Sequence, residues 1–157
     1  MNFQEILKKL QKSKEFADFK KDNPDCYLCA GFFVIDFESG NETKQIDFFM
    51  PKKNKIATFI LNDTIKLRIE DAIEKKFDEV NSKIKIELLE AIKKAKKECK
   101  SKINKIIAIL QVLEGRQVWN FTCMLEGFSM LLLHIDSQSG EITKKEKRGL
   151  FDFIKKE

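Results

Sequence analysis

Residues 26–50, CYLCAGFFVIDFESGNETKQIDFFM, predict a β-hairpin and with it a fold built on a sheet. The first part, residues 26–35, is rich in aromatic and β-branched side chains, which are typical of strands. The letters ESGN at residues 38–41 indicate a turn, and residues 43–50 predict a returning strand that Pro51 ends. Apolar side chains occupy both alternating sets of positions in the first strand, so we expect both of its faces to be buried.

The motif that ends this first strand occurs twice in the chain. IDxxSGxxTK at residues 35–44 recurs at residues 135–144. One explanation is an ancestral duplication that produces a quasi-symmetric sheet. The other is shared turn chemistry, in which glycine takes a positive φ and the Asp and Ser side chains accept hydrogen bonds from turn amides. Both explanations predict a second hairpin at residues 135–144.

Two short helices are predicted before the first hairpin. Apolar residues at helical spacing form one stripe over residues 3–10, but Phe16 and Phe19 lie off this stripe. We therefore expect a break near Ser13, which is a good N-cap for a second short helix. This second helix should end before Pro24, because the residue that precedes a proline disfavours helical geometry.

The middle of the chain predicts further strands and a long helix. Residues 56–61 are typical of a strand, and residues 64–69 fit either a strand or a helix, of which we favour the strand. From Glu70 onward the apolar spacing is helical, with a bend expected near Asn81-Ser82 and a second helical stripe up to residue 113. We expect Gly115 to end this helix.

The C-terminal part predicts the remaining strands. Residues 119–135 indicate a long strand, bulged at Gly127, and Ser139-Gly140 turn the chain into a final strand. A short helix is expected between Gly149 and Lys156. Together these elements predict a single α+β domain over residues 1–157, with a largely antiparallel five- to six-stranded sheet packed against a long helix and short helices at both termini. The expected core contains Phe33, Ile35, Ile106, Leu110, Trp119, Leu131 and Leu133.

No catalytic constellation is recognisable in the sequence. There is no glycine-rich phosphate loop and no nucleophile elbow. His134, the only histidine, stands between apolar residues of an expected strand, where a structural role is commoner than general base catalysis. Asp36 and Asp136 can be considered as paired carboxylates, but their positions in turns explain them without catalysis. We therefore predict that the protein is not an enzyme and that it needs no cofactor.

Four cysteines occur in the chain, and we interpret them as reduced structural thiols. Cys26 and Cys29 have the C-x-x-C spacing of zinc and redox sites, but they enter an apolar strand in which residues three apart point to opposite faces. No second C-x-x-C and no nearby histidine completes a ligand set for them or for Cys99 and Cys123. Metal binding and redox activity remain alternatives, and we predict no metal site.

The formal net charge of +5 is carried mainly by lysine, since only three of the 30 basic residues are arginine. Residues 83–105 contain nine lysines and three glutamates. On the expected helix, the lysines opposite the apolar stripe are Lys93, Lys96, Lys97 and Lys100. Such a stripe can contact a phosphate backbone or another anion. The solvated face of an ordinary helix in a lysine-rich protein has the same pattern.

The function is predicted from the burial that the strands require. Two strands are apolar on both faces, yet few helices are available to cover a sheet, so we expect apolar area to remain for a partner. We predict a small non-enzymatic binding or assembly module that uses an apolar sheet or helix surface for self-association, as a homodimer, or for a client protein. The alternative is a basic nucleic-acid-associated or ribosome-associated protein that uses the lysine-rich helix 83–105.

The composition excludes several other classes of protein. With 43% hydrophobic and 35% charged residues, the chain has the composition of an ordinary globular domain. Uninterrupted apolar stretches such as residues 130–133 are far shorter than the roughly 18 residues of a membrane-spanning helix. Charged residues interrupt the apolar positions at the N-terminus, so no signal segment is recognised. We expect a cytoplasmic protein without membrane contact.

Overall fold

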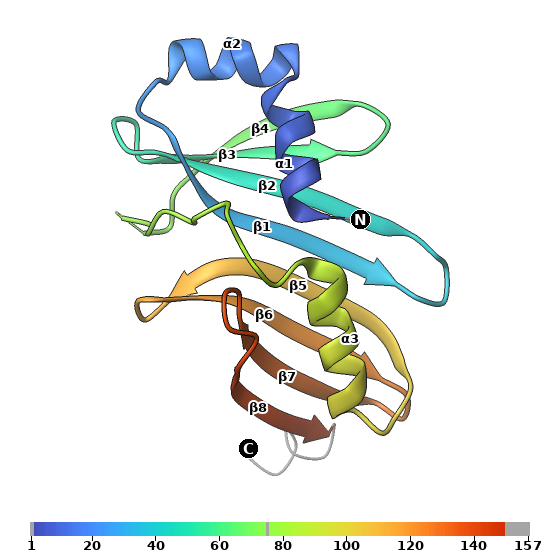
Figure 1. Ribbon diagram of the computed structural model, residues 1–157. Coiled ribbons are helices and arrows are strands. Elements are labelled where there is room, and N and C mark those ends of the chain that lie inside the picture. Colours follow the sequence, from blue (N-terminus) through green and yellow to red (C-terminus); the bar gives the residue numbers. More distant parts are fainter. Residues whose placement is uncertain (1, 75, 150–157) are drawn as a thin grey trace.

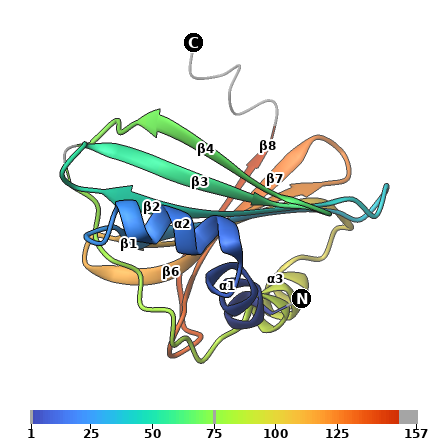
Figure 2. The same cartoon turned by 90° about the horizontal axis from the view of Figure 1, so that it is seen from above.

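The computed structural model describes residues 2–74 and 76–149. The helices in this part of the chain are α1 (Phe3–Gln11), α2 (Lys14–Asp22) and α3 (Leu88–Glu98). The strands are β1 (Tyr27–Asp36), β2 (Glu42–Met50), β3 (Lys55–Leu61), β4 (Ile65–Asp71), β5 (Ile103–Leu113), β6 (Arg116–Leu125), β7 (Ser129–Asp136) and β8 (Ile142–Gly149). These strands form one antiparallel sheet in the order β4-β3-β2-β1-β5-β6-β7-β8 (Figure 1). The three helices all lie on one face of this sheet (Figure 2).

The sheet consists of two meanders of four strands each. Strands β1 to β4 follow one another across one half and β5 to β8 across the other, and helices precede each meander in the chain. The halves join where β1 pairs antiparallel with β5, with Phe33 opposite Ala108 and Ile35 opposite Ile106. The chain therefore repeats one order, helix followed by four strands, on either side of the β1·β5 pair.

The repeated IDxxSGxxTK motif forms the same turn at two different places in this arrangement. Asp36 N donates to Asn41 O and Gly40 N donates to Asp36 O, and residues 136–141 make the same two bonds. One copy joins β1 to β2, however, whereas the other joins β7 to β8. If the two halves were superposed, β1 and β2 would correspond to β5 and β6. Shared turn chemistry, and not the repeat of the halves, therefore accounts for the motif.

The core lies between the sheet and the helices. Phe3 of α1 makes edge-on contacts with Phe33 and Trp119, at ring-centroid distances of 6.1 and 6.3 Å, and all three side chains are fully buried. The predicted break near Ser13 is confirmed, because its hydroxyl accepts a hydrogen bond from Phe16 N at 3.2 Å and so caps α2. The first hairpin and the strand after it are also confirmed, and all seven predicted core residues are buried in this cluster.

The predicted long helix is wrong. Residues 72–87 contain neither helix nor strand among their described positions, α3 has only 11 residues, and Ile103–Leu113 is the strand β5 in the middle of the sheet. Residues 106–113, IIAILQVL, carry no charge, so their spacing fits a helix and a strand equally well. The β-branched residues among them favour the strand, in which Ile106, Ala108 and Leu110 are the fully buried positions.

The predicted sheet of five to six strands is also wrong, since eight strands are described. Residues 65–71 form β4, which resolves the open alternative for residues 64–69 in favour of a strand. The long strand expected over residues 119–135 is two strands, β6 and β7, joined by a turn in which Gly127 has a φ of +86°. Glycine adopts this conformation without strain, so the chain reverses where a bulge was expected. The helix expected after Gly149 lies outside the described residues.

The crossing segment, which we define as residues 72–74 and 76–87, passes from one face of the sheet to the other around the ends of the strands (Figure 2). On the face without helices, the Phe77 ring packs on the Phe49 ring at a centroid distance of 5.2 Å, and the Tyr27 hydroxyl donates a hydrogen bond to Phe77 O. On the helix side, Trp119 Nε1 donates to Ile86 O at 2.8 Å. These contacts attach the crossing segment to both faces of the sheet.

Candidate functional site

None of the described helices covers the second face of the sheet, which we call the uncovered face (Figure 2). On this face the two central strands, β1 and β5, carry partly exposed apolar side chains, the strands beside them, β2 and β6, carry mainly polar ones, and the edge strands β4 and β8 carry charged ones. Contiguous exposed apolar surface on a soluble protein marks interaction sites. The apolar side chains include Phe32 and Val34 of β1, Ile107 and Ile109 of β5 and Leu132 of β7, and the charged ones include Lys66, Arg68 and Glu70 of β4 and Lys144, Glu146 and Arg148 of β8.

A hollow of about 430 Å³ lies on the uncovered face, between the start of the crossing segment and the sheet. The sheet contributes Phe32, Ile56 and Ile109 to its lining, and the crossing segment contributes Ile73 and Phe77. Ile73 is completely exposed, at 100%. A hollow of this size, with mainly apolar walls, has the dimensions of a small-molecule site.

Asp47 brings a carboxylate to this hollow, which we call the Asp47 hollow. On β2 it stands opposite Ala30 of β1 and Thr58 of β3, and it lines the hollow together with both. Its Oδ1 is buried and has no hydrogen-bond partner among the described residues. Burial raises the pKa of Asp47, an effect that a hydrogen bond with Thr58 and the charge of Arg68 oppose. A cation placed in the hollow would lie beside this carboxyl group, and its charge would offset part of the cost of the buried oxygen.

The charged side chains around Asp47 are already paired with each other. Arg68 Nε lies 2.8 Å from Glu70 Oε1, and both side chains are more than half exposed. Asp71 lies 3.8 Å from the ammonium of Lys55. Because these pairs are close to neutral and exposed to solvent, they compensate the buried oxygen of Asp47 only weakly.

Cys26 and Cys29 lie on opposite faces of the sheet, as their spacing predicts. Cys26 belongs to the core under the helices, whereas Cys29 lines the Asp47 hollow at a bulge of β1. All four cysteines are free, and no group of three metal-ligating side chains exists within residues 2–74 and 76–149. Burial, followed by the charge of Asp47, raises the pKa of Cys29 to about 12, so this thiol stays protonated at neutral pH.

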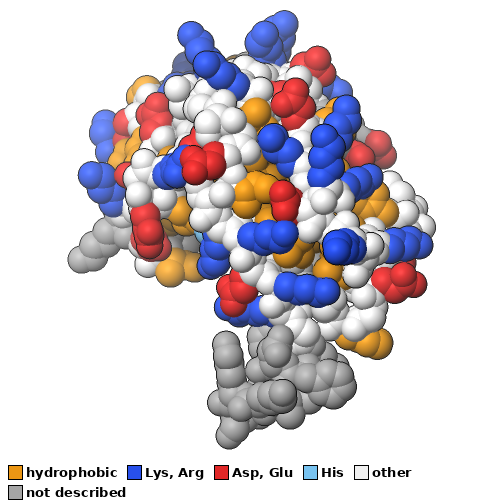
Figure 3. Space-filling view, turned by 60° about the horizontal axis from the view of Figure 1, so that its bottom comes forward, with side chains coloured by type: hydrophobic (Ala, Val, Ile, Leu, Met, Phe, Trp, Pro, Cys, Tyr) orange, Lys and Arg blue, Asp and Glu red, His pale blue; other side chains and the backbone are white. Residues whose placement is uncertain are grey.

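The four lysines predicted to contact an anion lie on or just beyond α3, which is much shorter than the helix predicted over residues 83–105. Lys93, Lys96 and Lys97 are exposed on α3, and Lys100 is exposed two residues after its end. None of the four forms an ion pair with a described residue, and Lys96 Nζ lies 4.6 Å from the centroid of the Phe37 ring. On the face seen in Figure 3, basic side chains are interspersed with acidic ones and do not form a separate block.

The acid and base candidates of the sequence are not brought together. Asp36 ends β1 beside the start of β5, whereas Asp136 ends β7 beside the start of β6. Because β5 and β6 are antiparallel, the two aspartates lie at opposite ends of the sheet. His134 stands opposite Lys144 near the β8 edge, where burial and the charge of Lys144 lower its pKa. These side chains therefore form no common site.

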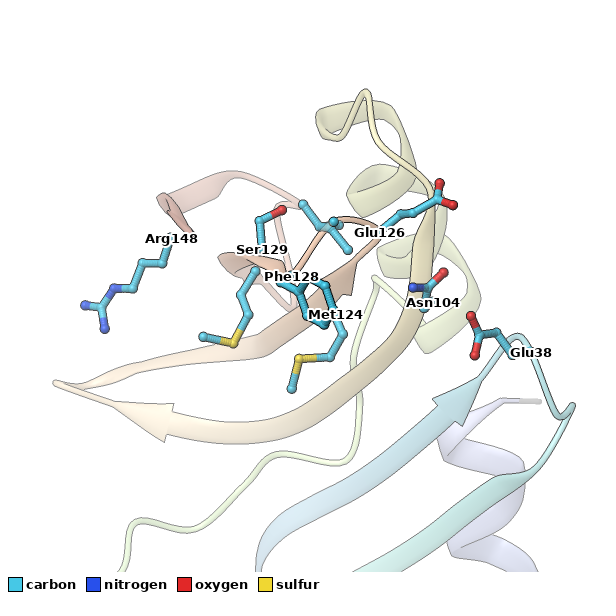
Figure 4. A pocket seen from close by; sticks show the side chains of 10 residues that line it. Glu38, Asn104, Met124, Glu126, Phe128, Ser129 and Arg148 are labelled. Atoms are coloured by element: carbon cyan, nitrogen blue, oxygen red, sulfur yellow. The ribbon is translucent and has the colours of Figure 1, made fainter. Parts of the chain in front are cut away.

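A second hollow, of about 540 Å³, lies beside the β6–β7 turn, toward the other end of the strands (Figure 4). Met124 and Met130 are opposite each other on β6 and β7 and line it, as does Glu38 of the β1–β2 hairpin. Phe128 in the turn has a φ of +62° and is 84% exposed. Flexible methionines and an exposed aromatic ring extend the apolar character of the uncovered face to this end.

Asp47 and the crossing segment are absent from the sequence predictions. One signal for Asp47 was present, because it is the one charged residue among Ile46 to Met50. The crossing segment carried no such signal, since its apolar spacing predicted a helix. Its role as a wall depends on contacts such as that between Phe77 and Phe49, which join distant parts of the chain.

Comparison with protein-family models and with curated proteins found no match. Among solved structures, the chain is similar to a "putative lipoprotein" from Clostridium difficile 630, with a TM-score of 0.64 and 12% sequence identity over 85% of this chain and 90% of that chain. At this identity the likeness shows a shared fold alone. In the described part of the chain, no helix is long and apolar enough to cross a membrane.

Proposed function

We propose that this protein is a non-enzymatic binding module that holds a small, largely apolar ligand on the uncovered face of its sheet. The observation that carries the proposal is the placement of the described helices, all of which cover the other face. The uncovered face keeps partly exposed apolar side chains on its central strands and charged ones on its outer strands. An apolar centre with a polar rim is the usual anatomy of a binding surface.

The dimensions of the uncovered face support this proposal. Eight strands spaced about 4.8 Å apart span roughly 34 Å, which is ample for a small molecule. The Asp47 hollow, at about 430 Å³, falls in the range of roughly 300–1,000 Å³ that ligand sites occupy. Its lining comes from the sheet and from the crossing segment, so a ligand placed there would contact both.

Binding without chemical turnover is supported by the placement of the reactive groups. His134 is on β7, four strands away from Asp47 in the order of the sheet, a separation of roughly 19 Å at the usual strand spacing. Cys29 lies beside Asp47, but its raised pKa leaves it without the thiolate that a nucleophile requires. The hollow therefore offers apolar contact and carboxylates, without a histidine or a reactive thiolate beside them.

Titration of the protein with 1-hexanol, followed by amide NMR signals, tests this proposal. We expect saturable shifts in β1, β2 and β5. Ile109→Gln places an amide in the wall of the hollow and should weaken binding roughly fivefold, because lost burial of an apolar group costs about 1 kcal/mol. Leu89→Gln is the matched control, since Leu89 is 51% exposed on α3 and should leave binding unchanged.

Two outcomes would overturn the proposal. One is the absence of any saturable shift in the native protein. The other is a dimer in light scattering that Ile109→Gln dissociates, which would make a second copy of the chain the occupant of the uncovered face.

Nucleic-acid binding is a second candidate function, favoured by the exposure of Lys93, Lys96, Lys97 and Lys100 without ion pairs to described residues. If these lysines contact phosphates, replacing all four with glutamine should flatten the slope of log affinity against log salt, by about 0.9 per lost contact for duplex DNA and about 0.7 for single strands. We expect weak binding at physiological salt that the replacement leaves unchanged. Submicromolar binding that disappears in the variant would put this function in first place.

A further inference from the structure

The Asp47 hollow has a fixed floor and one fixed wall. Its floor is held where Cys29 Sγ donates to Asp47 O at 3.5 Å, a contact that joins β1 to β2. Its wall is held by Phe77, whose ring packs on Phe49 and whose carbonyl oxygen accepts a hydrogen bond from the Tyr27 hydroxyl. A ligand that enters the hollow therefore meets groups that the sheet has already positioned, which lowers the entropy cost of binding.

The carboxyl group of Asp47 lines this hollow, and its buried Oδ1 has no hydrogen-bond partner among the described residues. A buried carboxylate oxygen is unfavourable unless a donor or a cation accompanies it. Arg68 is the basic residue whose charge acts on Asp47, but its guanidinium is already bound to Glu70 at 2.8 Å. A cationic ligand that donates a hydrogen bond to this carboxyl group would offset part of the penalty, and such charged hydrogen bonds are stronger than neutral ones.

The charges of the lining also favour a cation. Three further carboxylates line the hollow with Asp47, namely Glu70, Asp71 and Glu74. Arg68 is the one basic group among the described lining residues. Arg68 is paired with Glu70, and Asp71 with Lys55. The net negative charge of the lining therefore comes from Asp47 and Glu74, and it attracts cations and repels anions.

The uncharged side chains indicate what accompanies the cationic group. The rings of Phe32 and Phe77 can attract a cation as well as bury hydrocarbon. Gln45 and Gln111 offer amide oxygens as further acceptors for an ammonium, which has three donors. Ile73, which is completely exposed, presents apolar surface to a chain that leaves the hollow.

We propose that the Asp47 hollow binds an organic ammonium, with the ammonium group at the Asp47 carboxylate and an aliphatic chain against Phe32, Ile109 and Ile73. The inference rests on the proposed function, because it names the class of ligand for the same face. Metal ions are less suited to this site, because no group of three ligating side chains exists among the described residues.

Amide NMR titrations with three probes of equal chain length test the inference: hexylammonium chloride, 1-hexanol and sodium hexanoate. We expect hexylammonium to bind about tenfold more tightly than 1-hexanol, because it adds one charged hydrogen bond. Hexanoate should bind most weakly, because the carboxylates of the lining repel it. Asp47→Asn should remove the preference for hexylammonium while 1-hexanol still binds. Glu90→Gln is the control for the loss of one negative charge, because Glu90 is exposed on α3, on the other face of the sheet, and this variant should keep the preference.

The outcomes separate this inference from the proposed function. If 1-hexanol binds to the native protein and hexylammonium binds no more tightly, the inference fails and the proposed function stands. If none of the three probes binds, both fail. A second measurement does not depend on the variant: the carboxyl carbon signal of Asp47 in the native protein should shift with hexylammonium and stay in place with 1-hexanol. Equal shifts with both probes would overturn the inference.

Discussion

Asp136→Asn should destabilise the protein more than Asp36→Asn at neutral pH, although both aspartates occupy the same position of the same turn. Each Oδ1 accepts bonds from the amides two and three residues later, at 3.0 and 3.2 Å for Asp36 and at 2.8 and 2.9 Å for Asp136. Asp136 also binds a guanidinium, since Arg116 Nε lies 2.6 Å from its Oδ2. The corresponding cation at Asp36 is the Lys105 ammonium, 4.0 Å away.

The size of the effect follows from the pKa of Asp136. Burial alone raises this pKa, but hydrogen bonds from the Ser139 amide, the Arg116 guanidinium and the Gln138 amide outweigh it and lower the pKa to about 2. The fall from about 3.9 in an unfolded chain corresponds to roughly 2.6 kcal/mol. Because the Arg116 side chain is 45% exposed, solvent screening reduces this to roughly 1–2 kcal/mol.

The sign of the pH dependence follows from the same comparison. The folded pKa lies below the unfolded one, so the stabilisation is present above about pH 4 and is lost as the pH falls toward 2. Turn amides, led by that of Ser39, also lower the pKa of Asp36, but no guanidinium adds to them. Asparagine keeps an acceptor oxygen for the turn amides, so each substitution removes the charge and leaves the turn geometry in place.

Urea unfolding of the native chain and both variants between pH 7 and pH 2 measures the effect. We expect Asp136→Asn to lose roughly 1–2 kcal/mol at pH 7, Asp36→Asn to lose less, and the three curves to converge near pH 2. Two results would contradict this account. One is a loss in Asp136→Asn that persists undiminished at pH 2, and the other is a loss in Asp36→Asn at pH 7 that equals or exceeds it.

Three further predictions concern the core and the cysteines. Leu131→Ala should cost about 2–5 kcal/mol in urea unfolding because Leu131 is buried under the helices, whereas Leu132→Ala on the uncovered face should cost less; a loss below about 1 kcal/mol at Leu131 would contradict its burial. Gly31→Ala should lower the melting temperature, because the new Cβ would lie 2.9 Å from Phe3 Cε1 and would displace α1; an unchanged melting temperature would show that α1 yields without cost. Cys29 should react with iodoacetamide at pH 8 much more slowly in the native protein than in urea. Reduced protein should contain no stoichiometric zinc by elemental analysis. Equal reaction rates, or one zinc per chain, would contradict the assignment of structural thiols.

Part of the candidate site was within reach of sequence analysis. The exposure of Lys93, Lys96 and Lys97 follows from helical spacing, although the helix that carries them is shorter than predicted. The apolar second face of β1 follows from its unbroken run of apolar residues. The burial of Asp47 did not follow, because it depends on Thr58 of the next strand and on the crossing segment, whose contacts no local pattern records.

The fold, like the candidate site, could be predicted only in part from the sequence. The turns at Gly40 and Gly140, the break at Ser13 and the set of apolar residues in the core can be predicted from the chain, because turns and caps form their hydrogen bonds within a few residues. Tertiary contacts determine the other features of the fold. Ile103–Leu113 carries no charge from Ile106 onward, so its pattern fits a helix or a strand. It becomes a strand because its backbone groups pair with β1 and β6 at the centre of the sheet. A strand obtains its hydrogen bonds from partners that its own residues do not specify, so only the tertiary structure decides this pairing. The same holds for the placement of all described helices on one face of the sheet, which leaves the other face uncovered.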